Sequence, residues 1–188
     1  MDDPQQFEAF MRAYQDMVFG TAIRLLGDFA EAQDIAQEVF LKAHAHFDSL
    51  SRSATVGGWL KTVTRNLALN HLTRHRARWQ TFSDLVKPGD ETSDPVANLP
   101  APDLASERWD ADARHQWVEQ GLAQLPALQR VPLVLYHFEE LSYEAIAEEL
   151  DVSLSKVKTD IHRGRQALRR HLLRAQLRPE GMTPDTPS

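Results

Sequence analysis

A proline-rich acidic segment in the middle of the chain limits what this sequence can fold into. Residues 79–119 contain nine acidic and three basic side chains, and the rest of the 188-residue chain is balanced, so the net charge of −6 lies here. The prolines of this segment are Pro88, Pro95, Pro100 and Pro102. Prolines interrupt helices and like charges repel, so a packed core is disfavoured. We predict a flexible acidic linker over residues 79–110, between one module at 5–78 and another at 111–175, and a disordered tail at 176–188.

The composition excludes several classes of protein. With 42% hydrophobic and 26% charged residues, the sequence is typical of a soluble globular chain. It contains no cysteine, which excludes disulfides, thiolate zinc sites and cysteine nucleophiles, and fits a reducing compartment. The N-terminal MDDPQQFEAF lacks the apolar run of a secretory signal, and no window approaches the ~18 apolar residues of a membrane span. We expect a cytoplasmic protein.

The first module begins with the apolar spacing of two helices. In residues 5–26 apolar side chains recur every three or four positions, as on a helix with one buried face. Gly27 can end this helix, and Asp28 can cap a second helix over residues 30–47. A stripe on the second helix lies beside its apolar face, and by composition alone it is an ordinary solvated surface. This stripe consists of Asp34, Gln37, Glu38 and Leu41.

A loop and a basic helix complete the first module. SLSRSATVGG, residues 49–58, has the small polar composition of a loop. The helix predicted over residues 59–78 has five basic side chains and no acidic one. Thr62, Asn66, Asn70 and Arg74 recur on it every four residues. Basic side chains attract phosphate, amide side chains can hydrogen-bond to the edges of nucleobases, and the ring of Trp59 can stack on a nucleobase. The helix is therefore suited to bind nucleic acid, although its positive charge would also fit an acidic partner protein.

The second module contains a helix-turn-helix pattern. Ser142 can cap a short helix over residues 143–150, three turn residues follow, and a longer helix runs from 154 to about 174. The apolar side chains of the first helix, Ile146, Ala147 and Leu150, face those of the second. Acidic residues gather on the first helix and basic residues on the second. The second helix is therefore the predicted recognition helix, and we expect its N-terminal half to enter a major groove. The structural alternative is a three-helix module with a solvated basic face.

Three segments together resemble the sigma factors of bacterial RNA polymerase. AEAQDIAQEVFLKAH (30–44) resembles region 2, GGWLKTVTRNLALNHLTR (57–74) is similar to the adjoining promoter-melting segment, and residues 125–172 resemble region 4. A region 2 joined to a region 4 by a short linker is the plan of the extracytoplasmic-function (ECF) sigma factors, group IV of the sigma-70 superfamily. The resemblance implies an all-α protein without enzymatic activity or cofactor. Such a protein binds core RNA polymerase, directs it to promoters through −35 and −10 elements, and helps to open the DNA.

The resemblance also implies roles for individual residues and segments. The stripe on the second helix would dock on the clamp coiled coil of the largest polymerase subunit, and region 4 on the flap. The loop over residues 49–56 would receive a base flipped from the −10 element. The linker would thread the polymerase channels, and an anti-sigma factor is the regulator common in the family. The implied −10 residues are Arg52, Trp59, Lys61, Arg65, Asn66, Asn70 and Arg74. The implied −35 residues are Ser155, Lys156, Lys158, Thr159, His162 and Arg163.

The sequence departs from the family pattern at several positions. Asn70 stands where an acid is common, and residues 56–58 replace an aromatic lead-in to the tryptophan. Asp160 stands in the recognition helix where a base is common, and facing DNA it would repel phosphate or pair with a cytosine amino group. Gly164 replaces the usual alanine at a helix-propensity cost of about 1 kcal/mol. Pro132 is expected to shorten its helix at the N-terminal side.

Three other functions compete with this interpretation. His71 and His75 have a spacing that could ligate a metal on one helix face, but no carboxylate lies at a fitting offset. A one-component helix-turn-helix regulator would bind duplex operator DNA without polymerase. A sigma mimic would titrate an anti-sigma protein without touching DNA, and it would have no need of the basic helix or of the stripe that contains Asn66.

Overall fold

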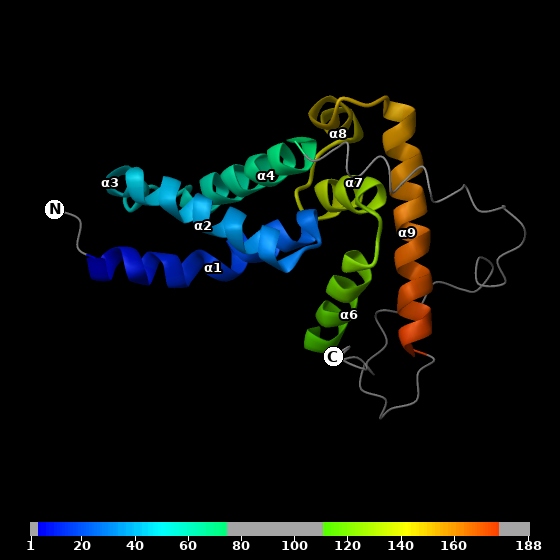
Figure 1. Cartoon of the computed structure of the whole chain (residues 1–188), viewed down its shortest axis with the longest axis horizontal. Coiled ribbons are helices and arrows are strands. Elements are labelled where there is room, and N and C mark those ends of the chain that lie inside the picture. Colours follow the sequence, from blue (N-terminus) through cyan, green and yellow to red (C-terminus); the bar gives the residue numbers. More distant parts are fainter. Residues whose placement is uncertain (1–3, 75–110, 177–188) are drawn as a thin grey trace, which may run out of the picture.

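The computed structural model describes residues 4–74 and 111–176, and all regular elements in these ranges are α-helices, which confirms the all-α prediction (Figure 1). The N-terminal module contains α1 (Pro4–Leu26), α2 (Phe29–Ala45), α3 (Phe47–Leu50) and α4 (Val56–Arg74). The C-terminal module contains α6 (Ala111–Ala123), α7 (Ala127–His137), α8 (Tyr143–Leu150) and α9 (Leu154–Gln176). The linker predicted over 79–110 lies outside the described residues, as does the predicted tail beyond residue 176.

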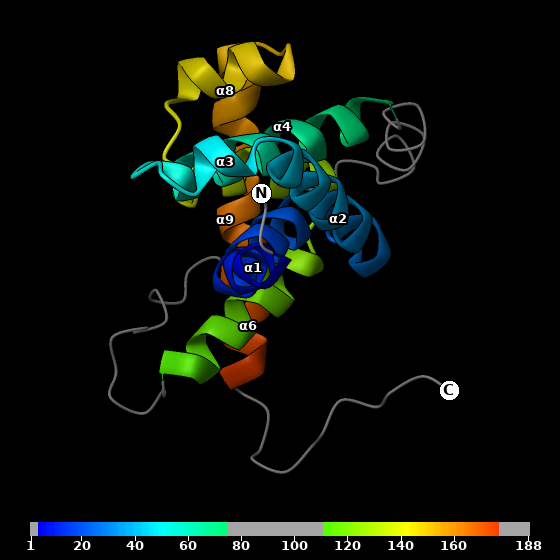
Figure 2. The same ribbon diagram turned by 90° about the vertical axis from the view of Figure 1, so that its left-hand side faces the viewer.

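The turn between α1 and α2 forms as the sequence predicts. Gly27 follows the last residue of α1 with a φ of +69°, a conformation that glycine adopts without a steric penalty. Asp28 then caps α2, because its side chain accepts a hydrogen bond of 2.9 Å from the backbone N–H of Glu31. This tight turn folds α2 back along α1, and α4 packs against both helices. Figure 2, which looks along α1, shows α2 and α4 on one side of it and α6 on the other.

The loop predicted over residues 49–58 is shorter than the sequence suggests. The short helix α3 extends to Leu50, and α4 already begins at Val56, so only residues 51–55 connect the two helices. The side chains of Leu50 and Val56 are buried, and this burial favours helix at both ends of the polar stretch. Gly57 and Gly58 therefore lie in the first turn of α4 rather than in a flexible loop, and the loop prediction is wrong at both ends.

Two features of the C-terminal module differ from the sequence prediction. Helix α6 was not predicted from periodicity at all. Pro132 was expected to shorten its helix, but α7 begins at Ala127 and runs through the proline to His137. Six consecutive residues of α7, from Arg130 to Leu135, are buried, because the helix lies between other helices. Burial on nearly all sides stabilises α7 enough to offset the backbone hydrogen bond that the proline cannot make.

The helix-turn-helix forms as predicted. Ser142 caps α8 by accepting a hydrogen bond of 3.1 Å from the N–H of Ala145. Asp151 ends α8 in the left-handed conformation, with a φ of 52°. Ile146 of α8 packs in one buried cluster with Val157 and Ile161 of α9. Helix α9 is thereby fixed against both α8 and α7.

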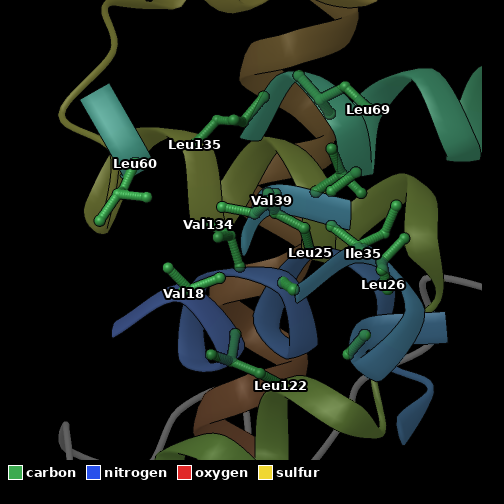
Figure 3. Close-up of a cluster of buried hydrophobic side chains, with 14 of the residues drawn as sticks. Val18, Leu25, Leu26, Ile35, Val39, Leu60, Leu69, Leu122, Val134 and Leu135 are labelled. Atoms are coloured by element: carbon green, nitrogen blue, oxygen red, sulfur yellow. The ribbon is translucent and has the colours of Figure 1, made fainter. Parts of the chain in front are cut away.

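The two modules share one continuous apolar core. Buried side chains of α1, α2 and α4 belong to the same cluster as those of α6, α7, α8 and α9. Figure 3 shows Leu122 of α6 and Val134 of α7 beside Val18 and Leu25 of α1. Helix α1 contacts both α6 and α7, and α7 in turn contacts α9. The sequence predicts two modules on a tether but contains no signal for this contact.

A close approach of α9 to α7 explains Gly164. A Cβ atom at this position would lie 3.0 Å from the backbone oxygen of Gln129 in α7, closer than ordinary packing permits. Gly20 of α1 also lies inside a helix, but a Cβ there would meet only the guanidinium of Arg24, at 3.7 Å. The first glycine is required by helix packing, whereas the second is not.

We predict opposite effects for the same substitution at these two glycines. Gly164→Ala should lower the free energy of unfolding by about 1–2 kcal/mol, because a backbone atom cannot easily move away from the added methyl group. Gly20→Ala should raise it by about 1 kcal/mol through helix propensity. Urea denaturation followed by circular dichroism measures both, and a stabilised Gly164→Ala variant would contradict the packing argument.

Candidate nucleic-acid and polymerase interface

The stripe predicted to bind polymerase lies fully on the outer face of α2. Asp34, Gln37, Glu38 and Leu41 are all exposed, and Leu41 exposes 65% of its surface. The opposite side of the same helix is buried and consists of Ala32, Ile35, Val39 and Ala43. The stripe thus presents one large apolar side chain next to polar and acidic ones. That combination is typical of a protein-binding surface.

A polar face of α4 is equally well separated from the core. Thr62, Asn66, Asn70 and Arg74 are exposed. The buried side of the helix includes Leu60, Thr64, Ala68 and Leu69, and the hydroxyl of Thr64 is satisfied by donating to the carbonyl of Leu60 at 2.7 Å. The side chains able to bond nucleic acid therefore form one accessible row. Because α4 contains no acidic residue, no carboxylate of this helix competes with phosphate for the side chains of the row.

The remaining predicted −10 residues do not share this exposed row. Trp59, Lys61 and Arg65 are each only partly accessible. The indole of Trp59 packs on the core and meets the ring of His46 edge-on, with 6.3 Å between centroids. Arg52 lies on the short connection before α4, where its Nε donates to the carbonyl of Asp48 at 2.9 Å.

Lys61 is directed toward the C-terminal module. Its Nζ donates to the backbone carbonyl of Phe138 at 2.6 Å and lies 3.5 Å from Oε1 of Glu139. Burial raises the pKa of Glu139, although the neighbouring Lys61 opposes that rise. In this arrangement the amino group of Lys61 is engaged by the C-terminal module, although 39% of its side chain is exposed.

The start of α9 is held by a cap that the sequence analysis missed. The hydroxyl of Ser153 accepts a hydrogen bond of 3.2 Å from the N–H of Lys156, and its carbonyl accepts one of 3.1 Å from Val157. A serine followed by the apolar spacing of a helix was the signal that could have identified it. The cap fixes the direction of the first turn of α9, from which the predicted −35 residues project.

All predicted −35 residues are exposed on the first part of α9. Between residues 154 and 163 the buried side chains are Val157, Asp160 and Ile161, and the apolar pair faces the core. Ten helical residues span about 15 Å, and a major groove is about 12 Å wide, so this segment has the size of a recognition element. The exposed residues are Ser155, Lys156, Lys158, Thr159, His162 and Arg163.

Asp160 does not face the solvent side of α9. The residue is 9% exposed, and its Oδ2 accepts a hydrogen bond of 2.8 Å from Nζ of Lys156, one turn earlier. Both roles considered from the sequence, repulsion of phosphate and recognition of cytosine, require a groove-facing carboxylate, so the structure supports neither. Asp160 instead partly neutralises Lys156, which leaves Lys158 and Arg163 as the free positive charges of this segment.

Known proteins match the two modules separately and together. The family model described as Sigma-70 region 2 matches residues 10–78, and that described as Sigma-70, region 4 matches residues 115–168. The chain is 31% identical over 182 residues to the ECF RNA polymerase sigma factor SigW of Bacillus subtilis, with 90% of each chain covered. This protein belongs to the ECF sigma factors. It directs RNA polymerase to promoters and is not an enzyme.

A second relative, the sigma-H factor, agrees with this assignment. The sigma factor is 32% identical over 169 residues to the RNA polymerase sigma-H factor of Pseudomonas aeruginosa, covering 88% of this chain and 86% of the relative. The chain is also similar to a chain of a solved co-crystal structure of the sigma factor RpoE with the anti-sigma factor NepR from Bartonella quintana. The match spans 90% of this chain and 98% of the other chain. Its TM-score is 0.46 at 24% identity.

The metal hypothesis finds no matching cluster in the part of the sigma factor that the structure describes. Among residues 4–74 and 111–176 no three histidine, aspartate or glutamate side chains are grouped to hold a metal ion. His71 instead places its Nε2 3.4 Å from Oε2 of Glu31. His75, its partner in the metal hypothesis, lies outside the described residues. None of the described helices is long and apolar enough to cross a membrane.

A histidine of α7 contacts α9 of the sigma factor through a side-chain hydrogen bond. Nε of Arg165 in α9 donates to Nε2 of His137 at 3.1 Å, which requires that this nitrogen carry no proton. The same guanidinium lies 5.2 Å from the centroid of the Tyr136 ring. Burial, followed by the charge of Arg165, lowers the pKa of His137 from its ordinary value of 6.5.

We predict that acidification weakens the packing of α9 on α7. Because the folded state favours neutral His137, its contribution to stability is complete above the unfolded pKa of 6.5 and is lost as the pH falls toward the lower folded pKa. His137→Gln keeps an acceptor for Arg165 but does not titrate. Unfolding curves at about pH 7.5 and about pH 5.5 should therefore differ less for the variant than for the wild type. Equal differences would show that His137 does not cause the pH dependence.

Proposed function

We propose that α9 contacts the −35 element through Lys158, Thr159, His162 and Arg163, with Ser155 and Lys156 on nearby phosphates. The observation that carries this proposal is the exposure of all six side chains along one short segment whose other face is anchored on α8 and α7. A rigid helix that presents several donors can enter a major groove without reorganising. The acidic side chains lie on the neighbouring helix α8, so the basic face of α9 is the face of the module that attracts DNA.

In the same proposal α4 and the preceding connection contact the −10 element. The exposed row that contains Asn66, Asn70 and Arg74 bonds one strand, with amides on base edges and the guanidinium on phosphate. Arg52 and Trp59 border the place where a flipped base would be held outside the duplex. Holding a base in this way costs a few kcal/mol of unstacking and keeps the strands apart. Lys61 and Arg65, which are partly accessible, complete the set.

The partners of the sigma factor are core RNA polymerase and promoter DNA. We assign the α2 stripe to the clamp coiled coil of the largest polymerase subunit, and the C-terminal module to the flap. The exposed Leu41, at the C-terminal end of the stripe, supports the first assignment, because a partner surface can bury a large apolar side chain that is otherwise exposed to water. Asp34 and Glu38 can then select a basic partner surface around this leucine.

Transcription in a purified system tests the function and the −35 assignment together. Core polymerase with this protein should give a run-off transcript from promoters selected out of a randomised library. Lys158→Ala and Arg163→Ala should each reduce −35-dependent transcription. Each removes a contact to a nucleobase, which should cost about 1–3 kcal/mol of promoter-binding free energy. Arg12→Ala removes an exposed basic side chain of α1 and is the matched control, so it should leave transcription unchanged.

Two outcomes of this experiment would overturn the proposal. A protein that binds duplex DNA tightly alone and adds nothing to core polymerase would be a one-component regulator. A loss that is equal on every DNA sequence would assign Lys158 or Arg163 to phosphate rather than to bases.

Asn66→Ala should impair strand opening more than formation of the closed promoter complex. The substitution removes a base-edge contact from the α4 row but leaves the charges that attract duplex DNA. Permanganate footprinting reports unpaired thymines, and a mobility-shift assay reports total binding. Reduced binding with normal permanganate reactivity would contradict a role of Asn66 in opening.

A further inference from the structure

A further basic side chain of α9 lies just beyond the segment assigned to the −35 element. Arg165 is exposed two positions after Arg163, and Nε of its guanidinium donates to Nε2 of His137 in α7 at 3.1 Å. The guanidinium also lies 5.2 Å from the centroid of the Tyr136 ring, which is within the range of a cation–π contact. Two groups of another helix therefore hold this long side chain in one orientation.

Packing fixes the groups that hold Arg165. Tyr136 packs against Tyr143 at the start of α8, with 4.8 Å between the ring centroids. Both tyrosines are half-buried and pack against the apolar core. The helices α7, α8 and α9 contact one another in pairs, and Figure 1 shows α7 and α8 beside α9. Arg165 thus projects from the place where these three helices meet.

The two groups that hold Arg165 leave its positive charge in place. Burial, followed by the charge of Arg165, lowers the pKa of His137, so the imidazole is neutral at neutral pH. A neutral imidazole and a tyrosine ring orient a cation without cancelling its charge. Lys156 differs, because the carboxylate of Asp160 lies 2.8 Å from its Nζ and partly neutralises it. The contact with His137 uses one N–H of a guanidinium that carries five such donors in a planar fork, so several donors remain for an anion.

Arg165 lies on the same side of α9 as Lys158. Seven residues are close to two turns of an α-helix, so the two positions are about 10 Å apart along the helix axis. Lys158 is assigned above to base edges inside a major groove. The groove is about 12 Å wide and is bordered by the phosphates of the two strands. A basic side chain about 10 Å further along the same side of the helix is placed at the border of the groove rather than at its floor.

We propose that Arg165 binds a backbone phosphate beside the −35 element, and that His137 and Tyr136 position its guanidinium for this contact. The proposal rests on the assignment of α9 to the −35 element made above. A guanidinium that is already oriented loses less side-chain entropy on binding phosphate than a freely rotating one. The contact carries no sequence information. It fixes the orientation of α9, so that Lys158 and Arg163 meet the base edges.

The salt dependence of promoter binding tests this phosphate contact. Core polymerase with the full-length sigma factor is bound to a promoter fragment at several potassium chloride concentrations, and the logarithm of the binding constant is plotted against the logarithm of the salt concentration. Each phosphate that a cation neutralises contributes about 0.9 to the slope of this plot. Arg165→Gln should therefore make the slope shallower by about one, and it should weaken binding by the same factor on every −35 sequence.

A matched control lies on the opposite side of the same helix. Arg174 is exposed, and nine residues at about 100° each place it half a turn away from Arg165. Arg174→Gln removes the same charge and should leave the slope unchanged. Arg165→Lys keeps the charge and should retain the slope, although it lacks the planar fork. Urea denaturation of each variant shows whether a change in folding contributes to the loss of binding.

A double-mutant cycle tests the positioning role of His137. His137→Leu removes the acceptor and should weaken promoter binding only while Arg165 is present, whereas His137→Gln keeps an acceptor and should preserve binding. An equal loss from His137→Leu in the Arg165→Gln background would show that the histidine acts through folding alone, and would overturn its positioning role.

The outcomes separate this contact from the −35 assignment on which it rests. An unchanged slope for Arg165→Gln, or a loss that depends on the −35 sequence, would overturn the phosphate contact. If Lys158→Ala relaxes the sequence preference in the same assay, the −35 assignment holds whichever result Arg165→Gln gives. If neither variant changes binding, the −35 assignment fails and the phosphate contact fails with it.

Discussion

The burial of α7 between α1 and α9 is the packing constraint on which the rest of the structure depends. Its residues from Arg130 to Leu135 are buried, so the helix has almost no solvent face to rotate toward water. One side positions α9 and therefore the predicted recognition surface, and another positions the N-terminal module. A proline within such a helix is tolerated because contact on all sides stabilises the backbone. Gly164 then lets α9 approach α7 closely enough to complete the packing.

Much of this architecture could be predicted from local patterns. Apolar spacing and helix caps depend only on residues that are close in the sequence. Asp28 and Ser142 therefore identified the starts of α2 and α8 correctly. The segregation of acidic from basic residues identified the exposed face of α9. Exposure of Asp34 and Asn66 followed from the same periodicities. Their roles in binding come from family resemblance and remain predictions.

The rest could not be predicted because it depends on contacts between distant segments. Nothing near Pro132 indicates that other helices surround it, and nothing near Asp160 indicates that it turns inward to Lys156. Arg130 follows Gln129 and precedes the apolar run of residues 131–135, so periodicity alone does not mark it as a buried residue. Two of its three carbonyl partners lie more than a hundred positions away, and carbonyls have no sequence signature.

The contact of Lys61 with the C-terminal module has a consequence for genetics. The same amino group that is proposed to bind promoter DNA also joins the two modules. Replacing this lysine would remove a proposed DNA contact and a contact between the modules at the same time. A mutational scan that scores only reporter output would therefore not separate the two losses. A double-mutant cycle with Glu139 would separate them, because Glu139 is a partner of Lys61 within the protein and is not a proposed DNA contact.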